Sequence, residues 1–339
     1  MSDLTTIISQ AAVKESFSGV VAIYQGNKAL YRGAFGYADI ANKRKNNLRT
    51  KFAIASGTKF FTALGIGTLI DDGKLSLDTT IERILGPGLT FIDPSATIAH
   101  LLTHTSGTYD YYDEDMDIDP ENYFVEIPWS HLETPADYLP LFLGKQPKYA
   151  PGARFSYSNG GFILAGIIIE KITGKLYRDY IRERVFIPAG MKDSGYYAFN
   201  RLPANTAWGY KKNINRGIET NIYNLPLRGG SDGGAYTTIK DLHNLWRAVL
   251  KYKILSPNLT KEFLTPKVQV ESGLEYGLGI YITKYQGSEM YSFVGGDAGV
   301  GFDSRYMATS GIQLSIISNI TDGEEEMRKL ILPLLAGIS

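Results

Sequence analysis

The 339-residue sequence contains no cysteine. Disulfide bonds, thiol catalysis and cysteine-ligated metal are therefore excluded, and the redox compartment stays open. An excess of one charge is also missing, because Lys and Arg total 35 and Asp and Glu total 35. Proteins that bind nucleic acid or anionic membranes usually carry a basic surplus or a basic face, so we expect no nucleic-acid partner.

Long hydrophobic runs are absent too, and no stretch reaches the roughly 20 apolar residues that a membrane-spanning helix needs. The first ten residues lack the basic start and apolar core of a secretion signal. The sequence as given is thus expected in the cytoplasm, or outside it if a leader had been removed. There is also no internal repeat or long flexible linker, which favours a single unit over 1–339.

Hydrophobic residues make up 44% of the chain, enough for a large core. Two strand-like runs joined at a Gly-Asn turn predict an opening hairpin over 19–24 and 29–36. Further segments are predicted as helices from 56 to about 74, 162–172, 175–184, 238–252 and 323–335, and as strands at 278–283, 290–294, 304–308 and 313–318. We expect the strands at both ends to share one sheet and the helical middle to be an insertion.

The segment Ser56-Gly57-Thr58-Lys59 places a hydroxyl and an amine three residues apart, on one helical face. A serine needs a neighbour to remove its proton, and a lysine in apolar surroundings can do so because desolvation favours the neutral amine. Ser56 and Lys59 are therefore predicted as nucleophile and base. Ser-x-x-Lys alone is weak support, since a chain this long should contain about one copy by chance.

Further motifs occur at His100–Gly107, Pro151–Asn159, Gly174-Lys175, Pro188–Met191 and Gly233–Thr238. With Ser-x-x-Lys, they make the chain resemble the serine β-lactamase and penicillin-binding protein superfamily, in particular its class C β-lactamase, D-peptidase and family VIII carboxylesterase branch. The motifs follow the family's order from about residue 15 to 325, which makes coincidence a poor explanation.

The resemblance implies an α+β fold, in which a mixed subdomain with an antiparallel sheet, about 1–55 and 230–339, packs on a helical subdomain, about 56–229. The catalytic cleft would lie between them. It also implies that Tyr157 shares proton transfer with the lysine and that Asn159 holds the acyl-side amide of a substrate. A phenol near two cations can lose its proton below its usual pKa of about 10, and we expect this of Tyr157.

The family's third element, a strand with Lys-Thr-Gly or His-x-Gly, is altered here. Its counterpart is Phe293-Val294-Gly295-Gly296, in which Phe293 replaces the basic residue that binds a substrate carboxylate. The change disfavours penicillinase or D-alanyl-D-alanine peptidase activity and favours an ester or a neutral amide. Arg305 could supply a replacement charge at the substrate site. The backbone N–H groups of Ser56 and Gly296 would form the oxyanion hole, with Gly295 beside them.

The predicted mechanism needs no metal or other cofactor. Lys59 and Tyr157 take the proton of Ser56, which attacks an ester or amide carbonyl of a small molecule or peptide, and a water later releases the acyl group. Two alternatives stay open: a penicillin-binding DD-carboxypeptidase or β-lactamase, and a non-hydrolytic sensor or scaffold that keeps the fold. The sequence does not fix the oligomeric state.

Three other patterns are weaker. Ser231 fits Gly-x-Ser-x-Gly, but the flanking strand and helix of a nucleophile elbow are missing. His100 and His104 lie four apart without the glutamate of a zinc motif, and His104 is expected to form local hydrogen bonds. The acidic stretch 110–126 is typical of a solvated loop. It could instead be a lid that selects cationic substrates. Its alternate acids Asp113, Asp115 and Asp117 lack the glycine of a calcium loop.

Overall fold

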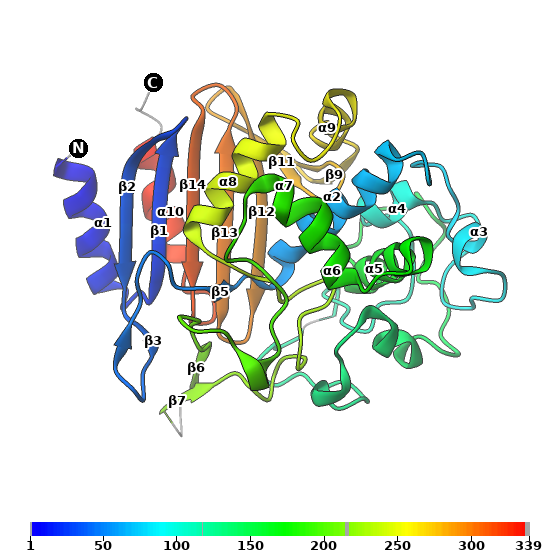
Figure 1. Cartoon of the computed structure of the whole chain (residues 1–339), viewed down its shortest axis with the longest axis horizontal. Coiled ribbons are helices and arrows are strands. Elements are labelled where there is room, and N and C mark those ends of the chain that lie inside the picture. The colour runs from blue at the N-terminus through cyan, green and yellow to red at the C-terminus, as the bar shows by residue number, and fades with distance from the viewer. Residues whose placement is uncertain (1, 117, 214–216, 336–339) are drawn as a thin grey trace.

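The computed structural model describes residues 2–116, 118–213 and 217–335. Its main feature is an eight-stranded antiparallel sheet with the order β2-β1-β14-β13-β12-β11-β10-β9 (Figure 1). The sheet strands are β1 (Gly19–Gln25), β2 (Lys28–Phe35), β9 (Val268–Glu271), β10 (Leu274–Tyr276), β11 (Tyr281–Tyr285), β12 (Ser288–Asp297), β13 (Val300–Met307) and β14 (Ile312–Ser318). Short two-stranded pairs are formed by β3 (Tyr37–Asp39) with β4 (Arg44–Lys45), β5 (Phe52–Ala53) with β8 (Tyr236–Thr237), and β6 (Tyr210–Asn213) with β7 (Gly217–Thr220).

Helices cover the sheet and fill the middle of the chain. The α-helices are α1 (Ser2–Lys14), α2 (Thr58–Asp71), α3 (Ile81–Leu85), α4 (Ile98–Leu102), α5 (Asn159–Thr173), α6 (Tyr177–Ile181), α7 (Ile187–Ala189), α8 (Ile239–Leu250), α9 (Pro257–Phe263) and α10 (Glu325–Leu334). The 3-10 turns are η1 (Ala55–Gly57), η2 (Trp129–His131), η3 (Pro135–Leu141) and η5 (Phe199–Arg201), and a π-helical turn, η4, spans Arg182–Phe186.

Strand β1 is buried on both faces because helices pack on each side of the sheet. Alternate residues of a strand point to opposite faces. Val21 and Ile23 join a core with α1 and α10, whereas Val20 and Ala22 join the larger core that contains α2 and α8. In Figure 1, α8 crosses in front of the sheet and α10 lies behind it. This two-sided cover explains the continuous apolar run of β1.

The two ends of the chain share the sheet, as predicted: β1 pairs with β14 from Gly19 opposite Ser318 to Gln25 opposite Ile312. The opening hairpin, the four late strands and the closing helix are confirmed within a few residues. The α+β class is confirmed as well. The division into subdomains near residues 55 and 230 stays a prediction.

Helix α2 carries Lys59 and is buried on nearly all sides from Thr58 to Leu69. Phe60 and Phe61 are almost completely buried, and each such side chain contributes about 2 to 3 kcal/mol through removal from water. A helix embedded in the core in this way holds its first turn firmly in place.

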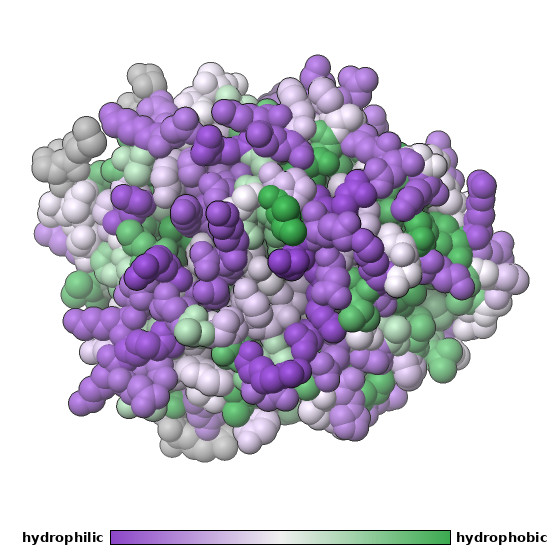
Figure 2. Space-filling model, viewed as in Figure 1, coloured by the Kyte–Doolittle hydropathy of each residue, from purple (hydrophilic) through white to green (hydrophobic). Residues whose placement is uncertain are grey.

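The sequence did not predict α1, β9 or β10, and the helix predicted at 175–184 consists of α6 followed by the π-helical turn. The face of the molecule in Figure 2 is mainly hydrophilic, with hydrophobic side chains in separate patches. None of the helices in the described part of the chain combines the length and hydropathy needed to cross a membrane.

Candidate active site

Ser56 lies in the tight turn η1, directly before α2. Ala55 has φ of 42°, a left-handed conformation that costs energy for a residue with a side chain. Hydrogen bonds hold the turn in place: Gly234 N–H donates to Ala55 O at 3.1 Å, and Ile54 N–H donates to Ala235 O at 3.0 Å. The partly exposed Ser56 lines an open cleft. The fold thus presents this hydroxyl at the start of a buried helix.

Lys59 is 2% exposed, and its Nζ lies 2.9 Å from Ser56 Oγ. The same Nζ donates to Asn159 Oδ1 at 2.6 Å and to the backbone O of Asp232 at 2.8 Å. Burial lowers the pKa of Lys59, although nearby acids partly oppose this effect. A neutral amine has two N–H groups and one lone pair. When both N–H groups of a neutral Lys59 bind these oxygens, its lone pair is left to accept the serine proton.

Tyr157 stacks on His104, with ring centroids 4.4 Å apart, and its ring centroid lies 4.7 Å from Lys59 Nζ. Burial raises the pKa of Tyr157 well above its usual value, and a hydrogen bond with Ser56 offsets only part of this rise. The expectation of a phenolate with a lowered pKa was therefore wrong. The cause is desolvation, and the nearby Glu114 adds to the rise in pKa. Tyr157 is a neutral phenol that can donate a proton.

Asn159 is the first residue of α5, whose preceding residue Ser158 caps the helix by accepting from Gly161 N–H at 3.0 Å. Its Oδ1 accepts from Lys59, and its Nδ2 donates to Tyr112 O at 2.9 Å and to Glu114 Oε1 at 3.2 Å. The amide is therefore oriented by the protein itself. Its predicted contact with a substrate amide would need a change in these bonds and stays a prediction.

The glycines of β12 approach the nucleophile closely. A Cβ atom on Gly295 would lie 2.2 Å from Ile54 O and 2.8 Å from Ser56 N, so only glycine fits at this position. Gly295 and Gly296 line the same cleft as Ser56. Strand β11 pairs with β12 only as far as Ser292. The structure thus brings both glycines to the site, and the oxyanion hole of Ser56 and Gly296 stays a prediction.

Two predicted substrate contacts lie elsewhere. Phe293 is 3% exposed and packs in an aromatic cluster, 5.1 Å from the Phe60 ring and 5.5 Å from the Trp246 ring. Arg305 forms an ion pair with the buried Asp303, with their nitrogen and oxygen atoms 2.7 Å apart. Neither Phe293 nor Arg305 is among the described residues that line the cleft. Both predictions were wrong because sequence spacing does not show to which side of a strand a residue points.

The alternative nucleophile and the metal hypothesis find no support in the geometry. Ser231 is completely buried, and its Oγ would contact any Cβ on Gly166, so no substrate can reach it. His104 accepts from Ser158 N–H at 2.9 Å through Nδ1, and its Nε2 lies 3.2 Å from Tyr276 Oη. Both ring nitrogens are therefore occupied. Burial holds the pKa of His104 well below its usual value, so the ring is neutral.

The acidic stretch is less solvated than its composition suggests. Asp110 is 4% exposed, and its carboxylate accepts from the N–H groups of Asn159, Gly160 and Tyr112 at 2.7 to 3.1 Å. The loop interpretation was wrong for this residue because a carboxylate can be buried when backbone donors surround it. Sequence reasoning missed Asp110 as a site residue, and its position among seven other acids gave no signal.

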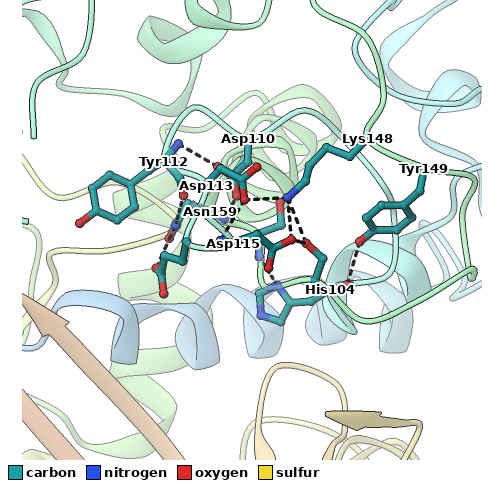
Figure 3. Close-up of polar contacts among 12 residues, drawn as sticks. His104, Asp110, Tyr112, Asp113, Asp115, Lys148, Tyr149 and Asn159 are labelled. Atoms are coloured by element: carbon teal, nitrogen blue, oxygen red, sulfur yellow. Dashed lines mark hydrogen bonds and ion pairs between the residues drawn. The ribbon is translucent and has the colours of Figure 1, made fainter. Parts of the chain in front are cut away.

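Lys148 connects the next acids to the motif around Tyr157. Its Nζ donates to Asp113 Oδ1 at 2.7 Å, to Asp115 Oδ2 at 3.1 Å and to Ser156 Oγ at 3.1 Å (Figure 3). Ion pairing by a lysine, rather than calcium, thus accounts for two of the alternate acids. The third, Asp117, lies outside the described residues.

The cleft is bounded by one acid and by several aromatic and apolar side chains. Its lining comprises Ser56, Tyr112, Glu114, Met116, Ile118, Pro120, Tyr157, Tyr281, Val294, Gly295 and Gly296. Among the described lining residues, Glu114 is the one ionisable group other than tyrosine. The cleft thus offers no cation to a substrate carboxylate.

Comparison with known proteins gives a consistent result. The chain is 30% identical over 291 residues to penicillin-binding protein 4* of Bacillus subtilis, covering 81% of this chain and 62% of that protein. It is 24% identical to a D-aminopeptidase of Brucella anthropi, covering 95% of this chain and 59% of that protein. The chain spans about three fifths of the length of these curated relatives.

Solved structures match over the whole chain. A penicillin-binding protein from Bacillus halodurans is 38% identical with a TM-score of 0.92, covering 96% of this chain and 99% of that one. A D-amino acid amidase from Ochrobactrum anthropi SV3 is 25% identical with a TM-score of 0.82, covering 99% and 100%. The Beta-lactamase family model matches residues 4–336, and the chain belongs to this family.

Proposed function

We propose that the chain is a serine hydrolase that acts through an acyl-enzyme at Ser56 on a small ester, amide or peptide. The contact of 2.9 Å between the buried Lys59 amine and Ser56 Oγ carries this proposal. A lysine with a lowered pKa, beside a partly exposed serine, is the arrangement of an activated nucleophile.

The first half of the reaction is acylation. Lys59 Nζ takes the proton from Ser56 Oγ while that oxygen forms a bond to the substrate carbonyl carbon. The N–H groups of Ser56 and Gly296 would hold the developing oxyanion. Tyr157, a neutral phenol, gives its proton to the leaving oxygen or nitrogen and regains one from the protonated Lys59.

The second half releases the acyl group. A water enters the cleft, gives a proton to the Lys59–Tyr157 pair and attacks the acyl carbon. The bond to Ser56 Oγ breaks, and the proton returns to the serine. The contacts of Lys59 and Tyr157 with Ser56 support this sequence of steps.

Two observations favour an amide or ester over a carboxylate-bearing substrate. The cleft has an acid but no cation among its described lining residues. Relatives of this chain include proteins named D-aminopeptidase, D-amino acid amidase and teichoic acid D-alanine hydrolase. The penicillin-binding carboxypeptidase or β-lactamase remains the second candidate, because several relatives are named penicillin-binding proteins.

Intact-mass analysis of the wild type and of Ser56→Ala tests the proposal. Both proteins are exposed to activated esters, a D-amino acid amide and a β-lactam, with product release followed in parallel. We expect an adduct or turnover with an ester or the amide that disappears in Ser56→Ala. Reaction with the β-lactam alone would favour the second candidate. A folded wild type that reacts with nothing would indicate a sensor or scaffold.

A further inference from the structure

A second cavity lies beside the catalytic cleft and is more enclosed. Its empty volume is about 680 Å³, including its mouth and the open solvent there. Tyr112 and Pro120 line both spaces, so the cavity adjoins the cleft. Ala55, the residue before the nucleophile, also lines the cavity. The cavity therefore lies next to the position of a substrate bound at Ser56.

The walls of this cavity are mainly aromatic. They include Tyr111, Tyr112, Trp129, Tyr138, Tyr197 and Tyr236. Aromatic faces attract cations because their π-electrons are negative at the ring face. No Lys, Arg or His is among the described residues that line the cavity. A cation in this space would thus meet favourable walls and no like charge from them.

Two carboxylates complete the lining, those of Asp232 and Asp297. Asp232 is already engaged, because Tyr111 Oη donates to its Oδ2 at 2.5 Å. Asp297 follows Gly296 in the chain, and its side chain accepts one hydrogen bond from the described residues, from Ala298 N–H at 2.8 Å. Most of its capacity to accept hydrogen bonds therefore remains available to a ligand. Burial raises the pKa of Asp297 to about 7, and a cation at its side would compensate its charge.

The lining of the cavity also includes a residue with a buried, unpaired donor. The indole Nε1 of Trp129 is enclosed and has no hydrogen-bond partner among the residues that the structure describes. Buried donors are normally paired, and leaving one unpaired is unfavourable. A ligand that brings an oxygen to the indole would satisfy this donor.

We propose that this aromatic cavity binds a protonated amine carried by the substrate, with Asp297 as its counter-ion. The proposal rests on the hydrolase function above and narrows its substrate class to esters or amides with an amine-bearing acyl or leaving group. Glu114, the acid of the open cleft, is the competing position for the amine. Its carboxylate accepts from Asn159 Nδ2 and lines the open cleft, whereas Asp297 lines the aromatic cavity.

Matched substrates test the proposal. Activated esters are compared in pairs that differ only by an ammonium in place of a methyl group: D-alanyl with 2-methylpropanoyl, and 4-aminobutanoyl with pentanoyl. We expect the wild type to prefer the amine in at least one pair, and Asp297→Asn to reduce that preference in kcat/KM at least tenfold. Trp129→Phe retains the ring and removes the donor, and should reduce the preference severalfold.

Glu114→Gln is the matched control, since it removes one charge from the open cleft. Because Glu114 contacts Asn159, this variant should change kcat/KM by the same factor for both esters of a pair. If Glu114→Gln alone abolishes the preference, the amine binds in the open cleft and the proposal is wrong. An unchanged preference in a folded Asp297→Asn variant would overturn it as well.

A measurement on the wild type does not depend on the folding of any variant. Butylammonium should inhibit hydrolysis of a neutral ester competitively, and at lower concentrations than butanol. Equal inhibition by the two would contradict the proposal. If no ester is hydrolysed in a Ser56-dependent way, the hydrolase function fails. Hydrolysis of neutral esters without any amine effect leaves that function intact and rejects only the cavity proposal.

Discussion

The carboxylate of Asp110 accepts a hydrogen bond of 2.7 Å from the backbone N–H of Asn159. Because Gly160 and Tyr112 donate to the same group, Asp110 connects the acidic stretch to the first turn of α5. Asn159 in turn accepts from Lys59. An acid outside the predicted catalytic set is therefore two hydrogen bonds away from the nucleophile's proposed base, and we infer that it positions Asn159.

Asp110→Asn should lower both stability and activity. An asparagine has one acceptor oxygen, so its NH₂ group must face at least one backbone N–H. Two buried donors that face each other without an acceptor cost about 1 to 3 kcal/mol. We expect the free energy of unfolding, measured in urea, to fall by this amount. Because Asn159 would shift relative to Lys59, kcat should fall at least tenfold while KM changes less.

Asp113→Asn serves as the control, since Asp113 pairs with Lys148 rather than with α5. It should reduce kcat much less. Equal losses of kcat in the two variants would show that the acidic stretch acts as a whole, and would exclude a specific role for Asp110.

Tyr157→Phe should lower kcat/KM by about 10² to 10⁴, the usual contribution of a positioned acid or base. The phenol is neutral because burial raises its pKa. We therefore expect the loss to be similar from pH 6 to 9, with no step that reflects tyrosine ionisation. Tyr281→Phe removes a hydroxyl from the same cleft and should have a far smaller effect. If Tyr157→Phe kept more than a tenth of the activity, Tyr157 would not be needed for proton transfer, and Lys59 alone would transfer the protons.

Much of the fold was predictable because local patterns agree with tertiary burial. The hairpin of β1 and β2 has a Gly-Asn turn between two strand-forming runs, a local pattern that predicts the pairing. The approach of Lys59 to Ser56 was predictable for the same reason, since a helix fixes residues three apart as neighbours. In both cases the deciding contacts are short-range in sequence.

The remaining features depend on contacts between distant segments. The burial of Phe293 against Phe60 and Trp246 depends on how β12 crosses α2 and α8. The pKa of Tyr157 depends on enclosure by residues from several loops. Helix α1 is amphipathic, but its burial requires α10 from the other end of the chain. No local pattern contains this information.

Glu324→Gln should stabilise the protein at high pH only. Burial raises the pKa of Glu324 from its usual 4.5 to about 7, and its Oε2 has no hydrogen-bond partner among the described residues. Below about pH 4.5 the group is protonated in both the folded and the unfolded chain. As the pH rises to 7, ionisation favours the unfolded chain, so the folded state loses stability.

Urea unfolding at pH 4 and pH 8 measures this effect. The free energy of unfolding of Glu324→Gln should equal that of the wild type at pH 4 and exceed it by about 1 to 3 kcal/mol at pH 8. Glu325→Gln is the neighbouring control, because the hydrogen bond and charge of Lys329 lower the pKa of Glu325. Glu325→Gln should not raise the free energy of unfolding at pH 8. If Glu324→Gln raised the free energy of unfolding equally at both pH values, its effect would come from helix propensity instead.

The position of the missing basic residue can be tested with lysines at two adjacent positions of β12. Phe293→Lys would place an unpaired charge among Phe60, Phe302 and Trp246. Removing a charge from water without a partner costs several kcal/mol, so we expect a large fall in melting temperature or a failure to fold. Val294→Lys instead places the ammonium in the open cleft, and the protein should fold with nearly normal stability.

The second variant then shows what the altered motif contributes to specificity. A cation at Val294 would attract a substrate carboxylate and repel an amine in the adjoining cavity. We therefore expect Val294→Lys to lower kcat/KM for amine-bearing esters and to raise it for carboxylate-bearing ones, with an intermediate effect on neutral esters. If Phe293→Lys folds normally and alone gains carboxylate recognition, the aromatic cluster must open toward the cleft, and the assignment of Phe293 to the core is wrong.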